Sequence, residues 1–360
     1  EAVLFSHVKR ISILNPLTFY HAGRHLYLGE RSFWKSPDGT TLASLGSLQK
    51  FKSDSTEKRF INIEKQWRSF LERSMVQSEG ISGTGPILFG GFSFDEQKSS
   101  SFVWDLFGDN LFCLPKFMLT DKSGQCYLTM NFLIRPETTI EELMKEVQIG
   151  EELCATAAPF TKIHSNSCTS QQEYDPDGWR KTVKDAVQVI KSTSIDKIVL
   201  ARELRLKFED TVMAEAVLGN LLKYQDTSYV FSLESGRDCF IGASPERLVK
   251  KEGNQILSTC LAGSIGRGST DEEDKQLGSK LLNDPKNLQE HRYVVEMIEQ
   301  ALGQEGLPVH VPEKPVLMKT KDIQHLYTPV TARGNEDVSL FRLIGKLHPT
   351  PALGGLPKKE

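Results

Sequence analysis

Four strand-like segments follow one another in the second half of the chain, and this succession constrains the fold more than any other feature. They cover residues 229–234, 238–243, 246–251 and 256–263. Runs of strands separated from runs of helices are typical of α+β folds, whereas strictly alternating strands and helices would indicate a parallel sheet. The order therefore predicts an α+β fold with a mostly antiparallel sheet, and nothing in it indicates a dinucleotide-binding fold.

The first half of the chain has mixed signals. Strands are predicted around 10–20, 24–34 and 41–46, a helix near 56–76, and a hairpin over 116–130. Asp121 to Gly124 supplies the turn of that hairpin. The glycine-rich segment 83–91 lacks the Gly-Lys-Ser/Thr ending of a phosphate loop and leads into a strand pattern, so we interpret it as close strand packing.

Four helices and two more strands are predicted after residue 173, besides the four strands above. Asp175-Pro176 begins a helix whose apolar residues, Trp179, Val183, Ala186, Val187 and Ile190, recur at helical spacing, so it should pack by one face. A strand is expected over 197–208, followed by a helix near 212–224. Asp284-Pro285 begins the next helix, and a strand at 315–330 and a helix at 338–347 precede the Pro/Gly-rich loop 348–355.

Composition narrows the class of partner. The 360 residues are 39% hydrophobic, and 44 basic and 47 acidic side chains give a net charge of -3 without a sustained run of either sign. This balance argues against a nucleic-acid or membrane surface and favours small molecules. No apolar run reaches the ~18 residues of a membrane span and the start is too polar for a signal peptide, so we expect a cytoplasmic protein. The oligomeric state is left open.

The six cysteines show no C-x-x-C spacing, so reduced and mostly buried thiols are expected rather than zinc ligands. The stretch 151–173 is the best candidate for a connection between two halves. We therefore divide the chain into an N-terminal half, 1–165, and a second half, 166–360, which carries the sharper motifs.

Two titratable residues in the second half suggest a reaction centre. Lys197 begins a predicted strand, and Glu246 lies in the turn Ser244-Pro245-Glu246. Burial lowers the pKa of a lysine and raises that of a glutamate, so one dry cleft can provide a general base and a general acid near neutral pH. Taken singly, each residue is more often a solvated edge or turn residue.

Six motifs in a fixed order change that balance. They are Lys197 to Arg202 (KIVLAR), Gly242 to Leu248 (GASPERL), Leu261 to Ser264 (LAGS), Asp284 to His291 (DPKNLQEH), Gln324 to Leu326 (QHL) and Leu347 to Gly355 (LHPTPALGG). The series resembles the chorismate-utilising enzymes, and within them the menaquinone-pathway isochorismate synthases. The resemblance implies packed, mostly antiparallel sheets with helices outside, a Mg²⁺ requirement, and chorismate as substrate.

The resemblance also implies roles for individual residues. Lys197 matches the general base that activates water for attack at C2 of chorismate, and Glu246 matches the general acid that protonates the departing C4 hydroxyl. Glu290 matches a magnesium ligand, whereas Asn287 stands where some relatives have an acidic residue. Without this motif, Glu290 would be interpreted as a helix-surface carboxylate.

Four further positions are matched to substrate contacts or specificity. Gly263 and Ser264 match a contact to a substrate carboxylate, and His348 matches a histidine near the reacting ring, although it could equally cap the preceding helix. Ala352 stands where salicylate and anthranilate synthases typically have threonine. The buried-core interpretation is preferred for His291.

These matches favour one reaction. Relatives that deliver ammonia carry glutamine at the position of Lys197, and the aminodeoxychorismate enzymes carry a lysine nucleophile at the position of Ala262. We therefore expect isochorismate synthesis without a redox cofactor. A salicylate synthase or a siderophore-pathway synthase remains an alternative. The family continues beyond the position of Glu360, so we expect a shortened form of a full enzyme, with a non-catalytic module of the same family as the alternative.

Overall fold

The chain divides into two compact units. The computed structural model describes residues 2–55, 57–78, 80–95, 102–160, 166–335 and 337–357. The first unit comprises Glu1–His164 and Met213–Ser244, and the second comprises Ser165–Val212 and Pro245–Glu360. This division differs from the expected division at residue 165, because strand β10 (Tyr229–Ser235) pairs with strand β2 (Arg31–Lys35) and so draws 213–244 into the first unit.

A nine-stranded sheet forms the first unit, in the order β11-β10-β2-β3-β6-β7-β1-β4 with β5 paired to β6. The remaining strands are β1 (Val3–Ile11), β3 (Thr40–Phe51), β4 (Ser74–Gln77), β5 (Phe89–Phe92), β6 (Asn110–Lys122), β7 (Gln125–Ile134) and β11 (Asp238–Ser244). All described pairs in this sheet are antiparallel except β1 with β4.

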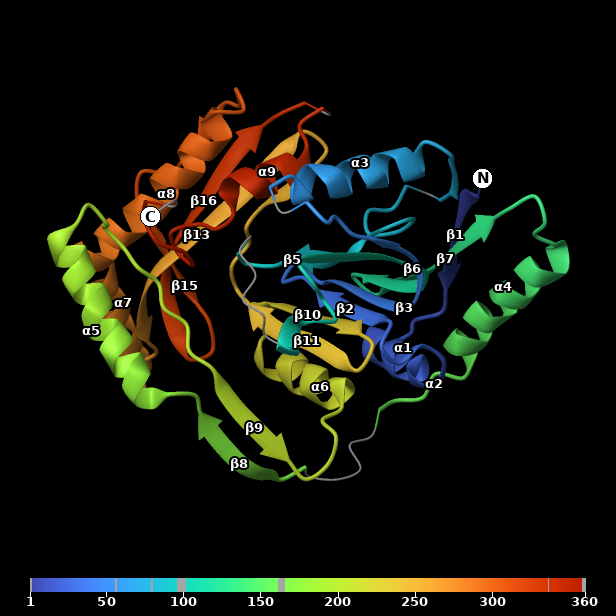
Figure 1. Ribbon diagram of the computed structural model, residues 1–360, viewed down its shortest axis with the longest axis horizontal. Coiled ribbons are helices and arrows are strands. Elements are labelled where there is room, and N and C mark those ends of the chain that lie inside the picture. Colours follow the sequence, from blue (N-terminus) through green and yellow to red (C-terminus); the bar gives the residue numbers. More distant parts are fainter. Residues whose placement is uncertain are drawn as a thin grey trace. The chain divides into compact units, whose positions relative to one another are not determined.

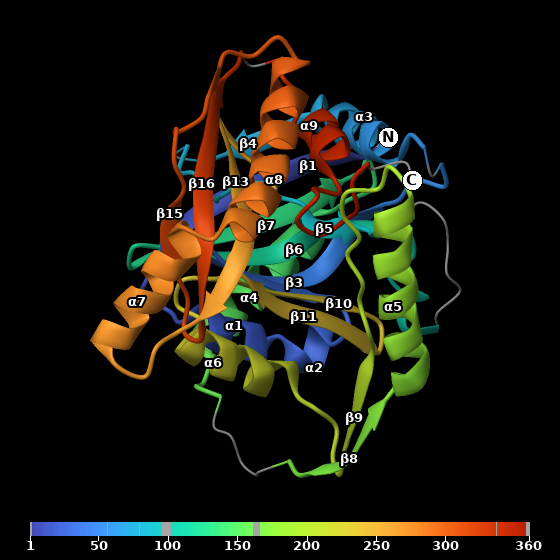
Figure 2. The ribbon, with the colours of Figure 1, turned by 90° about the vertical axis from the view of Figure 1, so that its left-hand side faces the viewer.

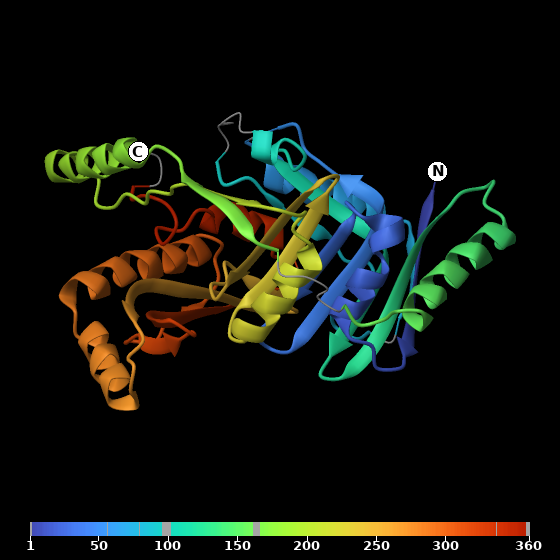
Figure 3. The ribbon, with the colours of Figure 1, turned by 90° about the horizontal axis from the view of Figure 1, so that it is seen from below.

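Alternate residues of these strands face two different layers. Leu45, Phe117 and Leu119 point into the larger core together with Phe19 of α1 (Pro16–Ala22) and Leu218 of α6 (Ala214–Tyr224). Their neighbours Leu42 and Met118 face the opposite side of the sheet, as the two-residue period of a strand requires. Helices α1 and α6 lie across the same face of the sheet (Figures 1 and 3).

Three more helices belong to this unit: α2 (Arg24–Tyr27), α3 (Arg59–Leu71) and α4 (Ile140–Ala155). The predicted helix near 56–76 and the hairpin over 116–130 are confirmed. At its turn the Gly124 N–H donates to Asp121 Oδ1 at 2.9 Å. The strands expected around 10–20 and 24–34 are wrong in part, because the Asn15 side chain accepts from the Leu17 and Thr18 N–H groups and starts α1 instead.

A five-stranded antiparallel sheet forms the centre of the second unit, in the order β12-β13-β16-β14 with β15 also paired to β16. Its strands are β12 (Lys250–Glu252), β13 (Gln255–Gly266), β14 (Val309–His310), β15 (Val316–Lys319) and β16 (Ile323–Arg333). Helix α8 (Pro285–Gly303) runs along β13 and β16 (Figure 2). Helices α7 (Asp271–Leu282) and α9 (Leu340–Leu347) complete this part. With the first unit, it confirms the α+β class.

Three strand predictions in this unit need correction. The strand expected over 197–208 is found only as β9 (Leu204–Phe208), paired with β8 (Cys168–Glu173). Residue 197 makes one isolated bridge, and a longer strand would need a continuous partner there. The strand expected over 315–330 is a hairpin of β15 and β16, and the strand expected over 246–251 is reduced to β12.

Helix α5 (Pro176–Ser192) begins at the predicted Asp175 cap, whose side chain accepts from the Gly178 N–H at 3.0 Å. Its expected packing is wrong: no residue of α5 is buried, and Val183 and Val187 are 38% and 42% exposed. The other three residues of the expected stripe, Trp179, Ala186 and Ile190, are only partly buried. Among the described residues, none of the helices has both the length and the apolar character needed to cross a membrane. Of the cysteines, Cys126 and Cys260 are buried, whereas Cys168 and Cys239 are exposed.

Candidate active site

The proline-rich loop after α9 holds Lys197 in place. Lys197 and Leu356 form an antiparallel bridge, in which the Leu356 N–H donates to the Lys197 carbonyl at 2.9 Å. The Lys197 ammonium donates to the carbonyl of Pro351 in the same loop. A Cβ on Gly355 would lie 3.0 Å from the Lys197 carbonyl, so glycine permits this close approach. The constrained loop therefore fixes both the backbone and the side chain of Lys197.

Lys197 forms an ion pair with Glu290. The Lys197 Nζ lies 3.0 Å from Glu290 Oε1, and the two side chains are 14% and 35% exposed. Glu290 lies in the second turn of α8. Asp284 sets the start of this helix, because the Asp284 side chain accepts from the Asn287 N–H at 2.8 Å and Pro285 follows at the first helical position. The cap thereby determines where Glu290 emerges.

Glu246 is a carboxyl group with an altered acidity. Burial raises the pKa of Glu246 to about 7, although the positive charge of Lys197 acts in the opposite direction. Removing solvent from a carboxylate disfavours its charged form, so near neutral pH a large share of these groups keeps a proton. This direction is the one expected for a general acid, while the catalytic role itself stays a prediction.

Cys260 links the three charged residues. This thiol on β13 is buried, and burial is the largest cause that raises its pKa well above the ordinary value. The charges of Glu246 and Glu290 also raise this pKa, and the charge of Lys197 lowers it. A group that responds to all three charges must lie near them, because Coulomb interactions fall with distance. Lys197, Glu246 and Glu290, from three separated motifs, therefore share one electrostatic environment.

Gly263 and Ser264 form an irregularity in β13. The pairing of β13 with β16 shifts register between Leu261 and Ser264, and Gly263 adopts a φ of +83°. A Cβ there would lie 3.1 Å from the Cβ of Asn287. Glycine is therefore required for conformation and for space. The Ser264 hydroxyl is exposed and lies 2.8 Å from Nδ1 of His325 on β16.

The other histidines have structural environments. His291 is buried, with Nε2 2.8 Å from the Thr328 hydroxyl and Nδ1 2.9 Å from the Ala262 carbonyl, and burial lowers its pKa. The core interpretation is confirmed. His348 is the C-cap of α9, where its N–H donates the last bond of the helix to the Ile344 carbonyl, and Ala352 packs beside the hydrophobic core. The substrate roles of His348 and Ala352 stay predictions.

Two contacts were not predicted from the sequence. His325 belongs to a quoted motif, Gln324 to Leu326, but no role was assigned to it, and its pKa is lowered by burial. The Pro351 carbonyl had no sequence signal, because every residue carries one. Pairing Ser264 with His325 would have required the register of β13 and β16, which the sequence does not specify.

The expected Mg²⁺ site at Glu290 can be compared with the donor atoms that the structure offers there. Within the described part of the chain, no three His, Cys, Asp or Glu side chains converge as a metal site. Glu290 offers a partly exposed carboxylate, and Mg²⁺ commonly binds proteins through one or two carboxylates, with water and a substrate anion completing its shell. The donor set thus fits a water-rich Mg²⁺ site and no fully protein-made one.

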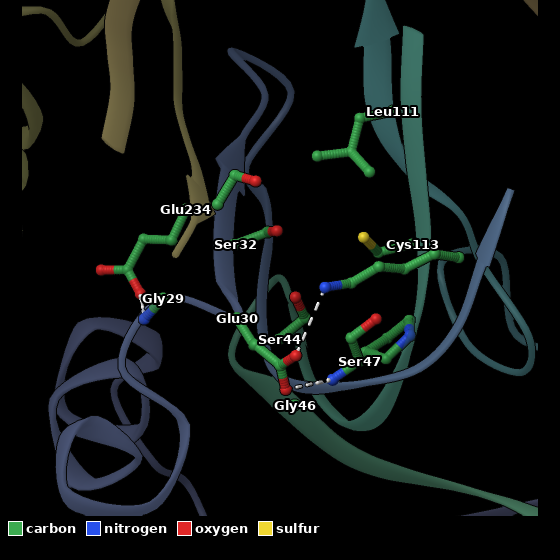
Figure 4. A pocket seen from close by; sticks show the side chains of 12 residues that line it. Gly29, Glu30, Ser32, Ser44, Gly46, Ser47, Leu111, Cys113 and Glu234 are labelled. Atoms are coloured by element: carbon green, nitrogen blue, oxygen red, sulfur yellow. Dashed lines mark hydrogen bonds and ion pairs between the residues drawn. The ribbon is translucent and has the colours of Figure 1, made fainter. Parts of the chain in front are cut away.

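A small polar pocket in the first unit is a different kind of site (Figure 4). Its volume of about 10 Å³ admits roughly one water molecule. Inside it, Glu30 accepts from the Ser47 N–H at 3.3 Å and from Lys50 at 3.4 Å. These groups satisfy one another, and the space is too small for a ring-containing substrate.

Comparisons with known proteins identify the family of the chain. Residues 1–360 match the family described as "Chorismate binding enzyme". Isochorismate synthase MenF of Bacillus subtilis (strain 168) is 40% identical over 371 aligned positions, which span 100% of this chain and 78% of that protein. The salicylate biosynthesis isochorismate synthase of Pseudomonas aeruginosa is 30% identical over 84% of this chain and 63% of that protein.

A solved structure supports the fold. MenF, the menaquinone-specific isochorismate synthase from Escherichia coli, superposes with a TM-score of 0.79, covering 99% of this chain and 78% of that chain at 22% identity. At this identity the likeness bears on the fold alone. The family match over the whole chain and the 40% identity to the Bacillus subtilis protein confirm the resemblance expected from the six motifs: the chain belongs to the chorismate-binding enzyme family.

Proposed function

We propose that this chain acts as a cytoplasmic, Mg²⁺-dependent isochorismate synthase that converts chorismate to isochorismate for menaquinone biosynthesis. The observation that carries the proposal is the pair of Lys197 and Glu246, in which burial raises the pKa of the carboxyl group to about 7 next to a lysine. The 40% identity to the Bacillus subtilis synthase supports the choice of reaction and pathway. Because the chain spans 78% and 63% of the two relatives, their activity comes to it as a proposal.

The proposed reaction exchanges one hydroxyl for another. Lys197, as the free amine, takes a proton from a water molecule while the water oxygen bonds to C2 of chorismate. The ring double bonds shift, the C4–O bond breaks, and Glu246 gives its proton to the departing hydroxyl, which leaves as water. One water enters and one leaves, so the product is an isomer of the substrate. A proton must then return from Lys197 to Glu246 before the next turnover.

Two groups compete for the Glu290 carboxylate in this proposal, Lys197 and Mg²⁺. In the structure its carboxylate pairs with Lys197 at 3.0 Å. A lysine held as an ammonium ion by a carboxylate cannot accept a proton, so the pair must open before Lys197 acts. Mg²⁺ bound at Glu290 would neutralise negative charge on the substrate. Glu290 is the residue of this chain that would hold the metal, and Lys197 would face the attacking water once its ion pair with Glu290 has opened.

The substrate-facing residues are assigned by the same reasoning. Ser264, held by His325 and exposed beside the Gly263 bulge, would donate to a substrate carboxylate. Ala352, which lacks a hydroxyl, supports a reaction that stops at isochorismate without losing pyruvate. His348 would lie near the ring.

The test is product analysis with the complete natural polypeptide that contains this chain. Incubation with chorismate and Mg²⁺ should give isochorismate, and kcat/KM should fall as the pH rises above about 7, because the acid must be protonated. Lys197→Ala and Glu246→Gln should each lower kcat by at least about 100-fold. Salicylate and pyruvate as main products would replace this function by salicylate synthesis, and binding of chorismate without turnover would support a non-catalytic module.

The role of Glu290 has its own control. Glu290→Gln should weaken Mg²⁺ binding, measured by calorimetry in the presence of chorismate, because it removes the negative charge that a hard cation prefers. Glu299→Gln, an exposed carboxylate further along α8, should leave it unchanged. Equal Mg²⁺ affinity in the two variants would remove Glu290 from the metal site.

A further inference from the structure

A cavity of about 650 Å³ lies in the second unit beside α8. Its apolar lining is Leu282, Leu288, Val295, Pro312 and Pro315. Pockets of roughly 300–1,000 Å³ with mostly apolar walls and a few polar groups are the usual form of small-molecule sites in proteins. The cavity has the size of such a site, and its walls combine these five apolar residues with six polar or charged ones.

The irregular edge of the sheet creates this space. Strands β14 and β15 both pair with β16 on its outer side: His310 opposite Thr331, and Val316 opposite Tyr327. Between these two points the chain from 311 to 315 is not part of a strand. Residues 328–330 of β16 therefore have no described strand partner on that side, and the cavity opens there with Thr328 in its wall.

The cavity is separate from the candidate active site. Leu288, Arg292 and Val295 recur at helical spacing and form one face of α8, while Glu290, two residues after Leu288, projects from the opposite side. At the cavity wall, His291 and Thr328 bond to each other at 2.8 Å. Their polar atoms are thus already paired within the protein.

Two cations at the cavity have no such partner. The side chains of Arg292 and Lys314 make no hydrogen bond or ion pair with any residue that the structure describes, and both residues are exposed. One carboxylate, Glu313, also lines the cavity and is likewise unpaired with described residues, so the lining carries a net positive charge. A cation next to apolar walls favours a ligand that is apolar at one end and anionic at the other.

We propose that this cavity binds a small amphipathic anion, with an aromatic or branched aliphatic body against Leu288, Val295 and Pro312 and a carboxylate or sulfonate between Arg292 and Lys314. The proposal does not depend on the reaction catalysed, because it concerns residues on the other face of α8. It assigns a second small-molecule site to the same unit.

Calorimetric titration with 8-anilinonaphthalene-1-sulfonate, an aromatic sulfonate of suitable size, tests this site without chorismate. Arg292→Ala and Lys314→Ala should each weaken binding about tenfold, since each removes a charge-assisted contact. Lys275→Ala, which removes an exposed lysine from α7, is the matched control and should bind like the unchanged chain.

A space-filling variant provides the second arm. Val295→Trp places a large ring in the cavity and should abolish binding, whereas Gln300→Trp, at an exposed position of the same helix, should not. If Val295→Trp fails to fold, the two cation variants decide. The absence of binding to the unchanged chain, or equal affinity in all variants, would overturn the proposal.

Discussion

Burial of Glu246 makes the stability of the folded chain depend on pH. The pKa of this carboxyl is about 7 in the folded chain and 4.5 for a solvated glutamate. Between these values the folded chain holds a proton that the unfolded chain has released. The free energy of unfolding is therefore highest below about pH 4.5 for this group, and the contribution is lost as the pH rises through 7.

Glu246→Gln should remove this contribution. Glutamine keeps the size of the side chain but cannot ionise. When the pH is raised from about 5 to about 8, the unchanged chain should therefore lose about 2–3 kcal/mol more of its free energy of unfolding than the Glu246→Gln variant does. Urea unfolding at the two pH values measures the difference. Glu272→Gln, at an exposed position of α7, should behave like the unchanged chain. Parallel curves for Glu246→Gln and the unchanged chain would show that the carboxyl is not desolvated.

Gly263 is the residue on which the shape of the candidate carboxylate contact depends. Two glycines of the second unit, Gly263 at φ +83° and Gly253 at φ +55°, have the left-handed conformation that other residues adopt at a cost. They differ in space: a Cβ on Gly253 meets nothing within 4 Å, whereas one on Gly263 meets Asn287 and Leu326 at 3.1 Å.

The two alanine variants separate these effects. Gly253→Ala should lower the free energy of unfolding by about 1 kcal/mol, for conformation alone. Gly263→Ala should lower it by about 2–3 kcal/mol, because crowding adds to conformation. Chemical denaturation of both variants gives the comparison. Equal losses would mean that Asn287 and Leu326 move aside freely.

At the scale of elements, the sequence predicts helix starts from local signals, but it does not predict which strands pair with one another. The helices starting after Asp175 and Asp284 were found because a cap and a first-turn proline act within a few residues. Asn15-Pro16 offered the same signal and was missed under a strand interpretation. The strand expected from Lys197 begins only at Leu204, because a strand exists only where another strand pairs with it.

The candidate site also combines residues that the sequence indicates locally with contacts that form only after folding. Lys197, Glu246 and Glu290 were found through motifs, since their side-chain chemistry is visible in the sequence. The roles of His325 and of the Pro351 carbonyl depend on which segments meet after folding. Helix periodicity failed for α5 for a related reason: it indicates an apolar face but not whether anything covers it.

The exposure of α5 can be tested directly. Val187→Ser should change the free energy of unfolding by less than about 0.5 kcal/mol, because Val187 is 42% exposed. Val294→Ala on α8 should lower it by about 2 kcal/mol, because Val294 is fully buried and its loss leaves a cavity. Thermal and urea unfolding of this chain measure both. A loss above about 1 kcal/mol for Val187→Ser would mean that α5 packs against another surface in solution.

At the scale of the whole molecule, a buried arginine joins the two stretches of sequence that build the first unit. Arg31 comes from the stretch 1–164, and it donates to Glu215 at 2.7 Å and to Glu234 at 2.6 Å, both from 213–244. Arg31 and Glu215 are fully buried. Burial alone would raise the pKa of Glu215, but the bonds and charge of Arg31 outweigh it and hold the pKa below its usual value. The cluster therefore works as an ionised unit.

Removing Arg31 should be costly because it leaves buried carboxylates without a counter-charge. Arg31→Met should lower the free energy of unfolding by about 3–5 kcal/mol. Arg24→Met is the matched control: Arg24 lies 3.3 Å from the same Glu215, but its side chain is 27% exposed, so its removal should cost less than about 1 kcal/mol. Urea unfolding of the two variants supplies the numbers. If Arg31→Met cost no more than Arg24→Met, the insertion of 213–244 would rest on strand pairing and apolar packing alone, and the buried charges would contribute nothing to joining the two stretches.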